Sequence, residues 1–322
     1  MGVLTVSGDE KVNERRATVV CIHAAGVAKS GERLYALGVE PSDERAVRSA
    51  QPDGFSGARI ELVELDRDHP GFSDAVYRQR RNAIAALAQD FSEGDPFPDV
   101  EYDPVEQGVW RTVWNELAAE HARAGCRRYR QACEAYGFDH TLIPSFAAVN
   151  AKLRRGEGFS LLPVAGLVKP RVFLEELGNW RFLATQYMRH HSQPLYTPEP
   201  DVVHEYIGHV PWLADPELAE LNYAFGLAAQ RADAERIEAL IRVYWYTIEF
   251  GVVREDDELK VYGAGILSSF GELRRFSAAE HRRWDLDAMA AQDFDPTHYQ
   301  AQLYVAPSYS RMRDDLLRWL RV

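Results

Sequence analysis

Two histidines, His204 and His209, lie five residues apart in the segment HEYIGH. Neutral imidazoles are common metal ligands, but in the zinc motif H-E-x-x-H the two histidines are only four residues apart. On an ideal α-helix, a spacing of four leaves two side chains about 40° from a common face, whereas a spacing of five leaves them about 140° apart. The two imidazoles can therefore meet at one metal ion only if the helix is widened or tilted, which Gly208 would help.

A carboxylate is needed as a third ligand, and Glu249 is the candidate. It lies in the aromatic-rich segment YWYTIEFG, where an ionised carboxylate is costly without a partner. Two imidazoles and one carboxylate, with open positions, form the ligand set of non-haem iron(II) oxygenases. A zinc-dependent hydrolase with the same three ligands and a water nucleophile is one alternative. Ordinary helix histidines, with Glu249 paired to an arginine, are another, and the spacing alone leaves all three open.

The composition indicates a globular protein with a sizeable core. The chain has 322 residues, of which 46% are hydrophobic, enough for one large domain or one domain with an appendage. Its net charge of −12 makes nucleic acid and anionic membranes poor partners. Three cysteines argue for a reducing compartment. No apolar run reaches the ~18 residues of a membrane span, and no signal peptide is visible, so we expect a cytoplasmic protein.

Hydrophobic periodicity predicts a mainly α fold with a few short β-strands. Residues 1–55 are expected to form an N-terminal extension of uncertain structure, and residues 56–322 a catalytic domain. A strand is predicted at 18–22, a loop or strand at 161–168, and a strand with a glycine-rich turn at 261–267. Helices are predicted over 74–91, 109–136, 173–190, 222–230, 234–249 and 310–320, and the apolar stripe of the second is expected to be core.

The segment 196–211, YTPEPDVVHEYIGHVP, closely resembles the signature of the pterin-dependent aromatic amino acid hydroxylases, the family of phenylalanine, tyrosine and tryptophan hydroxylases. Further matching segments occur in the same order, and together they are far more specific than any single one. The resemblance implies a mainly helical catalytic domain that uses iron(II), a tetrahydropterin co-substrate and O₂ to hydroxylate the ring of an aromatic amino acid. The matching segments are DHPGF at 68–72, PVAG at 163–166, TQYMRH at 185–190, the segment 244–251, and YGAGILSSFGE at 262–272.

The resemblance also implies roles for individual residues. The iron ligands would be His204, His209 and Glu249. Arg189 would clamp the substrate carboxylate, because a guanidinium fork can meet a carboxylate in two parallel hydrogen bonds. The remaining contacts to the amino acid would come from Asp201, which holds Arg189, from Thr197, which donates to the substrate carboxylate, and from Pro200, Trp245 and Phe250, which line the pocket for the ring.

For the pterin, the resemblance implies a site along Val164, Gly166, Leu167 and Val168, stacked on Phe173. Glu205 would face the pterin ring. Two further residues would act near the iron: Ser268 as a hydrogen-bond partner that fixes the tautomer of His204, and Tyr244 as a residue that tunes the site without being essential.

The preferred amino acid is less sharply indicated. Trp245 matches the phenylalanine and tyrosine enzymes, whereas tryptophan enzymes usually carry a smaller ring there. The position that separates phenylalanine from tyrosine enzymes aligns with Pro296, which matches neither. We expect phenylalanine hydroxylation to tyrosine, with tyrosine or tryptophan as alternative substrates. A binding protein without catalytic activity is a further alternative, which the intact ligand set disfavours.

The resemblance does not extend to a regulatory domain like that of the animal enzymes. No heptad repeat for tetramer assembly is present either. We therefore expect a monomer or a weak dimer that is not activated allosterically by its substrate.

Overall fold

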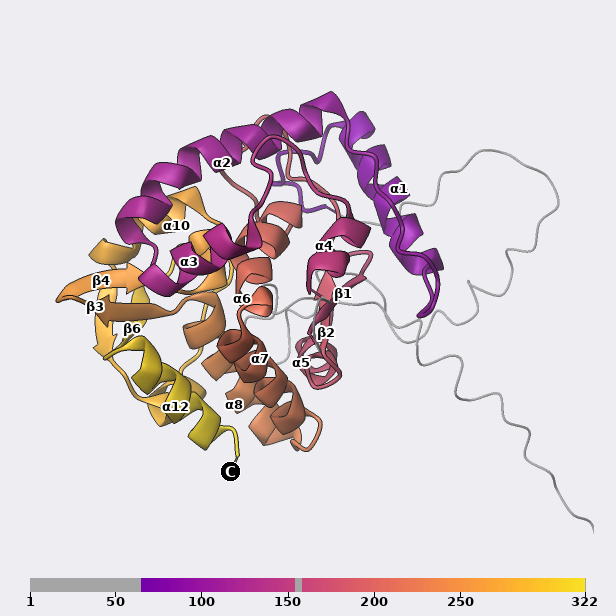
Figure 1. Cartoon of the computed structure of the whole chain (residues 1–322). Helices are drawn as coiled ribbons and strands as arrows, with labels where there is room; N and C mark the ends of the chain where they lie inside the picture. Colours follow the sequence, from indigo (N-terminus) through magenta and orange to yellow (C-terminus); the bar gives the residue numbers. More distant parts are fainter. Residues whose placement is uncertain (1–64, 154–157, 322) are drawn as a thin grey trace, which may run out of the picture.

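The computed structural model describes residues 65–153 and 158–321, so the predicted extension at 1–55 and its strand at 18–22 lie outside the described residues. The described part is mainly helical with few short strands, as predicted (Figure 1). Its α-helices are α1 Ala75–Asp90, α2 Pro104–Ala124, α3 Arg127–Tyr136, α4 Phe146–Leu153, α5 Pro170–Leu177, α6 Val210–Ala214, α7 Pro216–Ala229, α8 Ala234–Tyr244, α9 Ala264–Leu267, α10 Phe270–Arg275, α11 Leu286–Ala291 and α12 Tyr309–Trp319.

Three helical segments of other types complete the helical part. They are the π-helices η3 His204–His209 and η4 Trp245–Glu249 and the 3₁₀-helix η5 Phe276–Ala278. Within the described ranges, no helix combines the length and apolar character that crossing a membrane requires.

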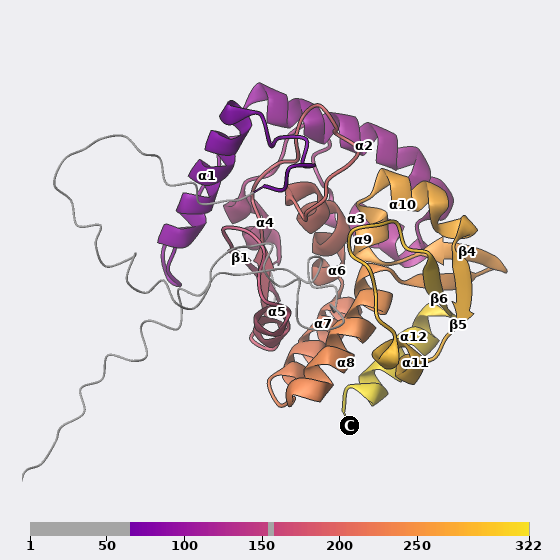
Figure 2. The same cartoon turned by 180° about the vertical axis from the view of Figure 1, so that it is seen from behind.

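The strands form two small sheets. One is a parallel pair, with Ser160 of one strand opposite Arg181 of the other. The other has the order β4-β3-β6-β5, with one antiparallel and two parallel pairings. Figures 1 and 2 show the four-stranded sheet at the opposite end of the molecule from α1, with α2 running along the outside between them. The strands are β1 Ser160–Pro163, β2 Arg181–Ala184, β3 Val252–Glu255, β4 Glu258–Val261, β5 Glu280–Arg283 and β6 Gln302–Ala306.

Helix α2 begins at a capping box, because the Asp103 side chain accepts from the backbone N–H of Glu106 while the Glu106 side chain accepts from that of Asp103. The large residues of its apolar stripe, Trp110, Val113, Trp114 and Leu117, are buried as predicted, whereas Ala118 at the end of the stripe is exposed. The prediction of one helix over 109–136 is wrong, because the chain breaks between α2 and α3. There the N–H of Cys126 donates to the carbonyl of Val261 at the end of β4, at 2.8 Å. A side chain at Gly125 would also lie 2.8 Å from the carbonyl oxygen of His121.

The predicted helix over 173–190 is also wrong beyond its first turns. Helix α5 ends at Leu177, and Trp180 then adopts a left-handed conformation with φ of 57°. The chain continues as β2, whose parallel pairing with β1 supplies backbone hydrogen bonds that a longer helix would have provided internally. Residues 185–201 are irregular and carry Arg189 and Asp201 toward the start of η3.

The helices that carry the predicted ligands are both π-helical. In η3 the N–H of Val210 donates to the carbonyl of Glu205, and in η4 that of Phe250 donates to Trp245, five residues back in each case. Such i→i+5 segments are rare and frequently occur at functional sites. Helix α9 packs against both π-helices. It therefore holds the two ligand-bearing segments in fixed relation to each other.

Glycine makes these contacts with α9 close. A side chain at Gly208 in η3 would lie 2.8 Å from the carbonyl oxygen of Ala264. A side chain at Gly265, within α9, would lie 2.8 Å from the ring of Phe250. Both distances are shorter than a normal van der Waals contact, so these positions require the absence of a Cβ.

Candidate metal centre and amino acid pocket

The three predicted ligands converge in the interior of the fold. The Nε2 atoms of His204 and His209 are 3.0 Å apart. The carboxylate of Glu249 lies 3.3 Å from His209 Nε2 through Oε1 and 3.8 Å from His204 Nε2 through Oε2. A cation about 2.1 Å from each nitrogen, with a right angle between the two bonds, would hold those nitrogens about 3.0 Å apart. The donor atoms therefore have separations that fit one shared metal ion.

The π-helix explains how histidines five residues apart can meet. A helix with i→i+5 hydrogen bonds takes more than four residues per turn, so the fifth residue returns close to the side of the first. This is the widening that the spacing required. Gly208 lies within this widened turn, and its lack of a side chain also allows the close approach of α9.

Glu205 is a second carboxylate close to the histidines. Ligand atoms of His204, Glu205 and His209 all lie within 4.8 Å of one another, so Glu205 could compete as a third ligand. Its Oε1, however, accepts hydrogen bonds from the backbone N–H and the hydroxyl of Thr185, at 3.2 and 3.1 Å. Burial raises the pKa of Glu205 to about 7. These hydrogen bonds hold Glu205 against Thr185 and partly oppose the rise in its pKa, whereas the carboxylate of Glu249 lies 3.3 Å from Nε2 of His209, so we take Glu249 as the ligand.

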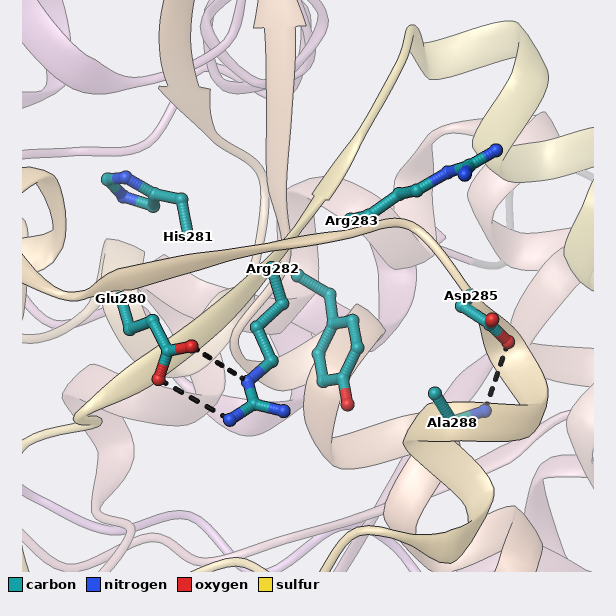
Figure 3. A pocket seen from close by; sticks show the side chains of 7 residues that line it. Glu280, His281, Arg282, Arg283, Asp285 and Ala288 are labelled. Atoms are coloured by element: carbon teal, nitrogen blue, oxygen red, sulfur yellow. Dashed lines mark hydrogen bonds and ion pairs between the residues drawn. The ribbon is translucent and has the colours of Figure 1, made fainter.

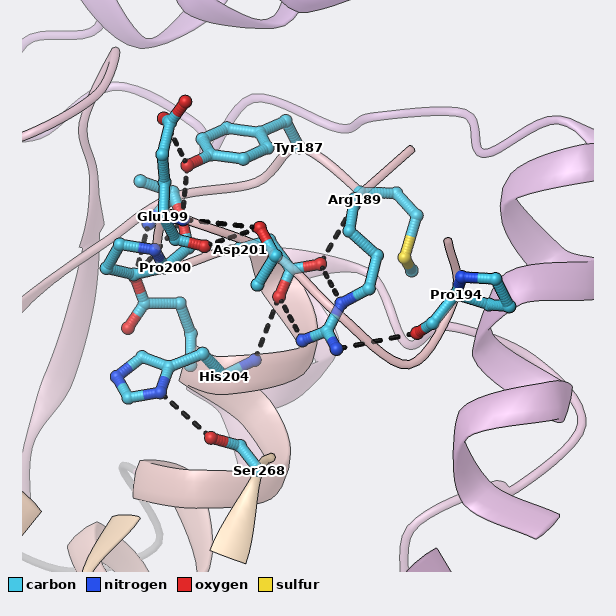
Figure 4. A network of polar contacts seen from close by, with 12 residues as sticks. Tyr187, Arg189, Pro194, Glu199, Pro200, Asp201, His204 and Ser268 are labelled. Atoms are coloured by element: carbon cyan, nitrogen blue, oxygen red, sulfur yellow. Dashed lines mark hydrogen bonds and ion pairs between the residues drawn. The ribbon is translucent and has the colours of Figure 1, made fainter. Parts of the chain in front are cut away.

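Ser268 determines which nitrogen of His204 carries a proton. The Ser268 hydroxyl donates to the carbonyl of Ala264 at 2.8 Å and lies 2.9 Å from Nδ1 of His204 (Figure 4). A hydroxyl has one proton to donate, so it accepts from Nδ1–H of the imidazole. Nε2 of His204 then presents its lone pair toward His209 and Glu249, as a metal ligand must.

A buried ion pair stands next to this centre. Nε and Nη2 of Arg189 donate to the two carboxylate oxygens of Asp201 at 2.9 and 2.8 Å, and both side chains are buried (Figure 4). Asp201 also accepts from the N–H of His204 at 3.2 Å, which ties the pair to the start of η3. Because one edge of the guanidinium is used by Asp201, a ligand carboxylate would meet the edge that carries Nη1. That atom has only a long contact of 3.5 Å, with the carbonyl of Pro194.

Thr197 is oriented differently from our expectation. Its hydroxyl donates to the carbonyl of Glu199 at 2.7 Å, so the proton is used within its own turn. A donation to a substrate carboxylate would require this hydrogen bond to break. The carbonyl of Pro200 accepts from the hydroxyl of Tyr187 (Figure 4), which fixes the loop just before η3.

Aromatic rings gather beside Glu249. Trp245 is fully buried and stacks on Phe294 at 4.2 Å between ring centroids, and it also contacts Phe250 at 4.4 Å. Tyr244 points elsewhere, because its hydroxyl donates to the side chain of Asn222 at 3.0 Å. Trp245 and Phe250 are thus adjacent, as a pocket for an aromatic ring requires, and Tyr244 is a buried core residue with a satisfied hydroxyl.

The predicted pterin segment connects β1 to α5. The N–H of Val164 donates to Ala184 in β2, Leu167 is half-buried, and Val168 is buried. A Cβ at Gly166 would meet nothing within 4 Å, so this turn faces open space. Phe173 is buried and meets its neighbouring rings edge to face, which are those of Phe182 at 5.2 Å and Tyr244 at 5.8 Å.

Two other features of the described residues do not join this site. Asp74, His190 and His191 are close enough together to hold a metal ion. However, Nε2 of His190 lies 3.2 Å from Asp74 and its Nδ1 lies 2.7 Å from the hydroxyl of Ser192, so both ring nitrogens have protein partners. A shallow surface cavity along β5 contains an Arg282–Glu280 ion pair and no predicted site residue (Figure 3).

Two residues at this site had no predicted role. Thr185 lies within the TQYMRH segment, but nothing in the sequence indicated that it would bind Glu205. Gln300 contacts the indole of Trp245, 55 residues away in the chain. A single glutamine in a polar loop carries no sequence signal for such a contact.

Comparison with known proteins identifies the relatives of the chain. Residues 59–322 match the model of the family described as biopterin-dependent aromatic amino acid hydroxylase. The chain is 43% identical over 266 residues to tyrosine 3-monooxygenase of Drosophila melanogaster, covering 80% of this chain and 45% of the relative. It is 46% identical over 241 residues to the chloroplastic phenylalanine 4-monooxygenase of Chlamydomonas reinhardtii, covering 75% and 64%. The chain thus spans about half to two thirds of the length of these relatives.

A solved structure shows the same fold. Phenylalanine hydroxylase of Chromobacterium violaceum, with bound iron(III) and the oxidised cofactor 7,8-dihydrobiopterin, matches with a TM-score of 0.64 at 30% identity. The match covers 68% of this chain and 82% of that one. Taken with the family match over 59–322, this shows that the chain belongs to the biopterin-dependent aromatic amino acid hydroxylases.

Proposed function

We propose that the protein hydroxylates the ring of an aromatic amino acid with iron(II), a tetrahydropterin and O₂, and that phenylalanine is its leading substrate. One observation supports this most directly. The Nε2 atoms of His204 and His209 and the carboxylate of Glu249 lie within 3.0–3.8 Å of one another, beside the buried Arg189–Asp201 pair. This combines an iron(II)-type ligand set with a guanidinium that suits the carboxylate of an amino acid.

Each residue then has a defined task. His204, His209 and Glu249 hold the iron, which together with the pterin supplies the activation of O₂ when bound. Arg189, fixed by Asp201, binds the substrate carboxylate through its Nη1 edge. Positioning of this kind brings the ring to the metal without a bimolecular search.

The remaining residues shape and protect the centre. Trp245 and Phe250 exclude water around the substrate ring, which strengthens polar interactions inside the pocket. Glu205 faces the pterin with a carboxyl that can hold a proton near neutral pH, because burial raises its pKa to about 7. The open turn at Gly166 leaves space for a flat heterocycle beside it.

Pocket volume favours phenylalanine or tyrosine over tryptophan, because the large indole of Trp245 leaves less room for a tryptophan substrate. Tyrosine is the second candidate, since relatives named as phenylalanine and tyrosine monooxygenases match at similar identity. Half-buried Pro296, which departs from both substrate classes, lies in the loop that follows Phe294, the ring stacked on Trp245.

A competition assay tests the proposal. Purified enzyme with iron(II), tetrahydropterin and O₂ is given phenylalanine, tyrosine and tryptophan together, and the products are separated by chromatography. Tyrosine formed from phenylalanine is the expected main product. Absence of any hydroxylated product would overturn the oxygenase assignment, and hydrolase activity with zinc and no reductant would support the alternative.

The ligand assignment has its own test, in which Glu249→Gln is compared with Glu205→Gln. Iron content is measured by elemental analysis after reconstitution, and folding is measured by circular dichroism. Glu249→Gln should lose tight iron binding while Glu205→Gln retains it. The opposite pattern would make Glu205 the third ligand.

A further inference from the structure

Gln300 has a side-chain amide whose oxygen and nitrogen are both engaged. Its Oε1 accepts a hydrogen bond from Nε1–H of Trp245 at 3.0 Å. Its Nε2 donates to the backbone carbonyls of Asp295 at 2.9 Å and of His298 at 3.1 Å. One amide therefore joins the indole to two points of the loop 295–298, which precedes β6.

The indole that Gln300 contacts lies next to the metal centre. Trp245 is the first residue of η4 and Glu249 is the fifth. Residues four apart in an i→i+5 helix project from nearly the same side, so the side chains of Trp245 and Glu249 lie on one side of η4. Trp245 is fully buried between Phe250 and Phe294. A buried indole N–H needs a hydrogen-bond acceptor. The position of Gln300 therefore constrains the direction in which the indole N–H of Trp245 points.

Gln300 is itself held from the other side. Its backbone N–H donates to Oε1 of the buried Glu272 in α10, at 3.0 Å. The ring of the neighbouring Tyr299 occupies the space that a side chain at Gly271 would fill, and Arg275 lies 4.3 Å from its centroid. Gln300 is thus fixed to α10, so it can impose an orientation on Trp245 instead of following it.

We propose that Gln300 is a positioning residue that sets the orientation of Trp245 and the shape of the loop 295–298 together, and thereby determines how the pocket discriminates between aromatic rings with and without a para-hydroxyl group. This inference rests on the proposed function, since it takes Trp245 as a wall of the substrate pocket. Loss of the amide frees the indole and the loop at once. The pocket then loses discrimination between phenylalanine and tyrosine.

The experiment uses Gln300→Met, which keeps the length of the side chain but removes its donors and its acceptor. Dissociation constants for phenylalanine and tyrosine are measured by equilibrium dialysis on the full-length protein loaded with iron and pterin under nitrogen, and kcat/KM is measured for both amino acids in air. For each measurement, we take the ratio of the phenylalanine value to the tyrosine value. We expect this ratio to move toward one by about tenfold in Gln300→Met, a change typical of a lost polar contact at a specificity site. Gln292→Ala is a control for the loss of a glutamine amide nearby, because the Gln292 amide also donates to a loop carbonyl, that of Asp293, but does not contact Trp245.

A second comparison separates positioning from a general loss of folding. In a Trp245→Phe background, adding Gln300→Met should change the ratio clearly less than it does in the wild-type background, because the indole partner of the amide is already absent and only its contacts with the loop remain to be lost. Equal effects of Gln300→Met in both backgrounds would overturn the inference, as would an unchanged ratio in the single variant or the same change in Gln292→Ala. A wild-type protein that binds neither amino acid would overturn the proposed function, and this inference with it. If the wild-type protein and Gln300→Met discriminate equally well between phenylalanine and tyrosine, the inference is overturned while the proposed function stands.

Discussion

Glu272 places a carboxyl in the protein interior at a cost that depends on pH. Its exposed fraction is only 6%, and burial raises its pKa from 4.5 to about 7, with the N–H of Gln300 and the charge of Arg275 partly opposing the rise. Glu272→Gln keeps an oxygen that can accept from Gln300 and removes the ionisable proton. The substitution therefore isolates the energetic cost of burying the charge.

The direction in which stability changes with pH follows from the difference between the pKa of Glu272 in the folded and unfolded states. The pKa is higher in the folded protein than in the unfolded chain, so the folded state binds the proton more tightly between pH 4.5 and about 7. The stability that this group contributes is fully present below pH 4.5 and is lost as the pH rises through about 7. The shift of the pKa corresponds to roughly 3 kcal/mol. Relative to wild type, Glu272→Gln should thus gain about that much free energy of unfolding between pH 4.5 and pH 8.

Urea unfolding of the iron-free proteins at pH 5 and pH 8 measures the difference. Glu205, whose pKa is also raised to about 7, is present in both proteins and cancels in the comparison. The substitution Glu238→Gln at an exposed position of α8 controls for the loss of one negative charge. If the stability difference between Glu272→Gln and wild type changes by less than about 0.5 kcal/mol between the two pH values, the size of an ordinary surface effect, burial of the Glu272 charge does not carry the expected cost.

Three further substitutions probe other parts of the site. Arg189→Lys should raise KM for the amino acid by about 100-fold with a smaller change in kcat, because a single ammonium cannot make both hydrogen bonds to Asp201 and still face the substrate. An unchanged KM in steady-state kinetics would contradict this. Arg81→Met should lower the free energy of unfolding by about 3 kcal/mol, because it leaves the carboxylate of Glu199 without its 3.0 Å ion pair. Denaturant unfolding measures this loss, and a double variant that also carries Glu199→Gln should recover much of it. Gly166→Ala should keep the wild-type melting temperature, because a Cβ there meets nothing within 4 Å, but raise KM for the pterin; a normal pterin KM would move the cofactor away from this turn.

Local signals in the sequence indicated the segments that carry the candidate metal ligands, but not the path of the chain around them. The pair His204 and His209 could be recognised from residue type, and the five-residue spacing even indicated a widened helix. The choice between Glu249 and Glu205 could not be made from residue type, because both are buried carboxylates close to the histidines. It depends on the hydrogen bonds that Thr185 donates to Glu205, a contact across 20 residues.

The two wrong helix predictions share a cause. The segments 109–136 and 173–190 both have helical periodicity, and both are interrupted where a backbone group pairs with a distant strand. In the first, Cys126 bonds to Val261, and in the second, β2 pairs with β1 after the left-handed turn at Trp180. Such pairings depend on chain segments far away in sequence, so periodicity within one segment cannot reveal them. Gln300, which lies in a loop, is missed for the same reason, because its role depends on Trp245 in η4, 55 residues away in the chain.

The two π-helical turns make the centre sensitive to the number of residues in the chain. Each turn holds more residues than an α-helical turn that would span the same distance. Deletion of Ile207, between the two histidines, would leave every donor atom in the chain and give a four-residue spacing that suits an ordinary α-helix. It would, however, turn the part of the chain before the deletion by about 100° relative to α6, which follows directly after His209. The position of the metal centre within the fold is therefore encoded by the number of residues in η3 as well as by the identity of its ligands. A one-residue deletion here would be more damaging than most substitutions at the same position.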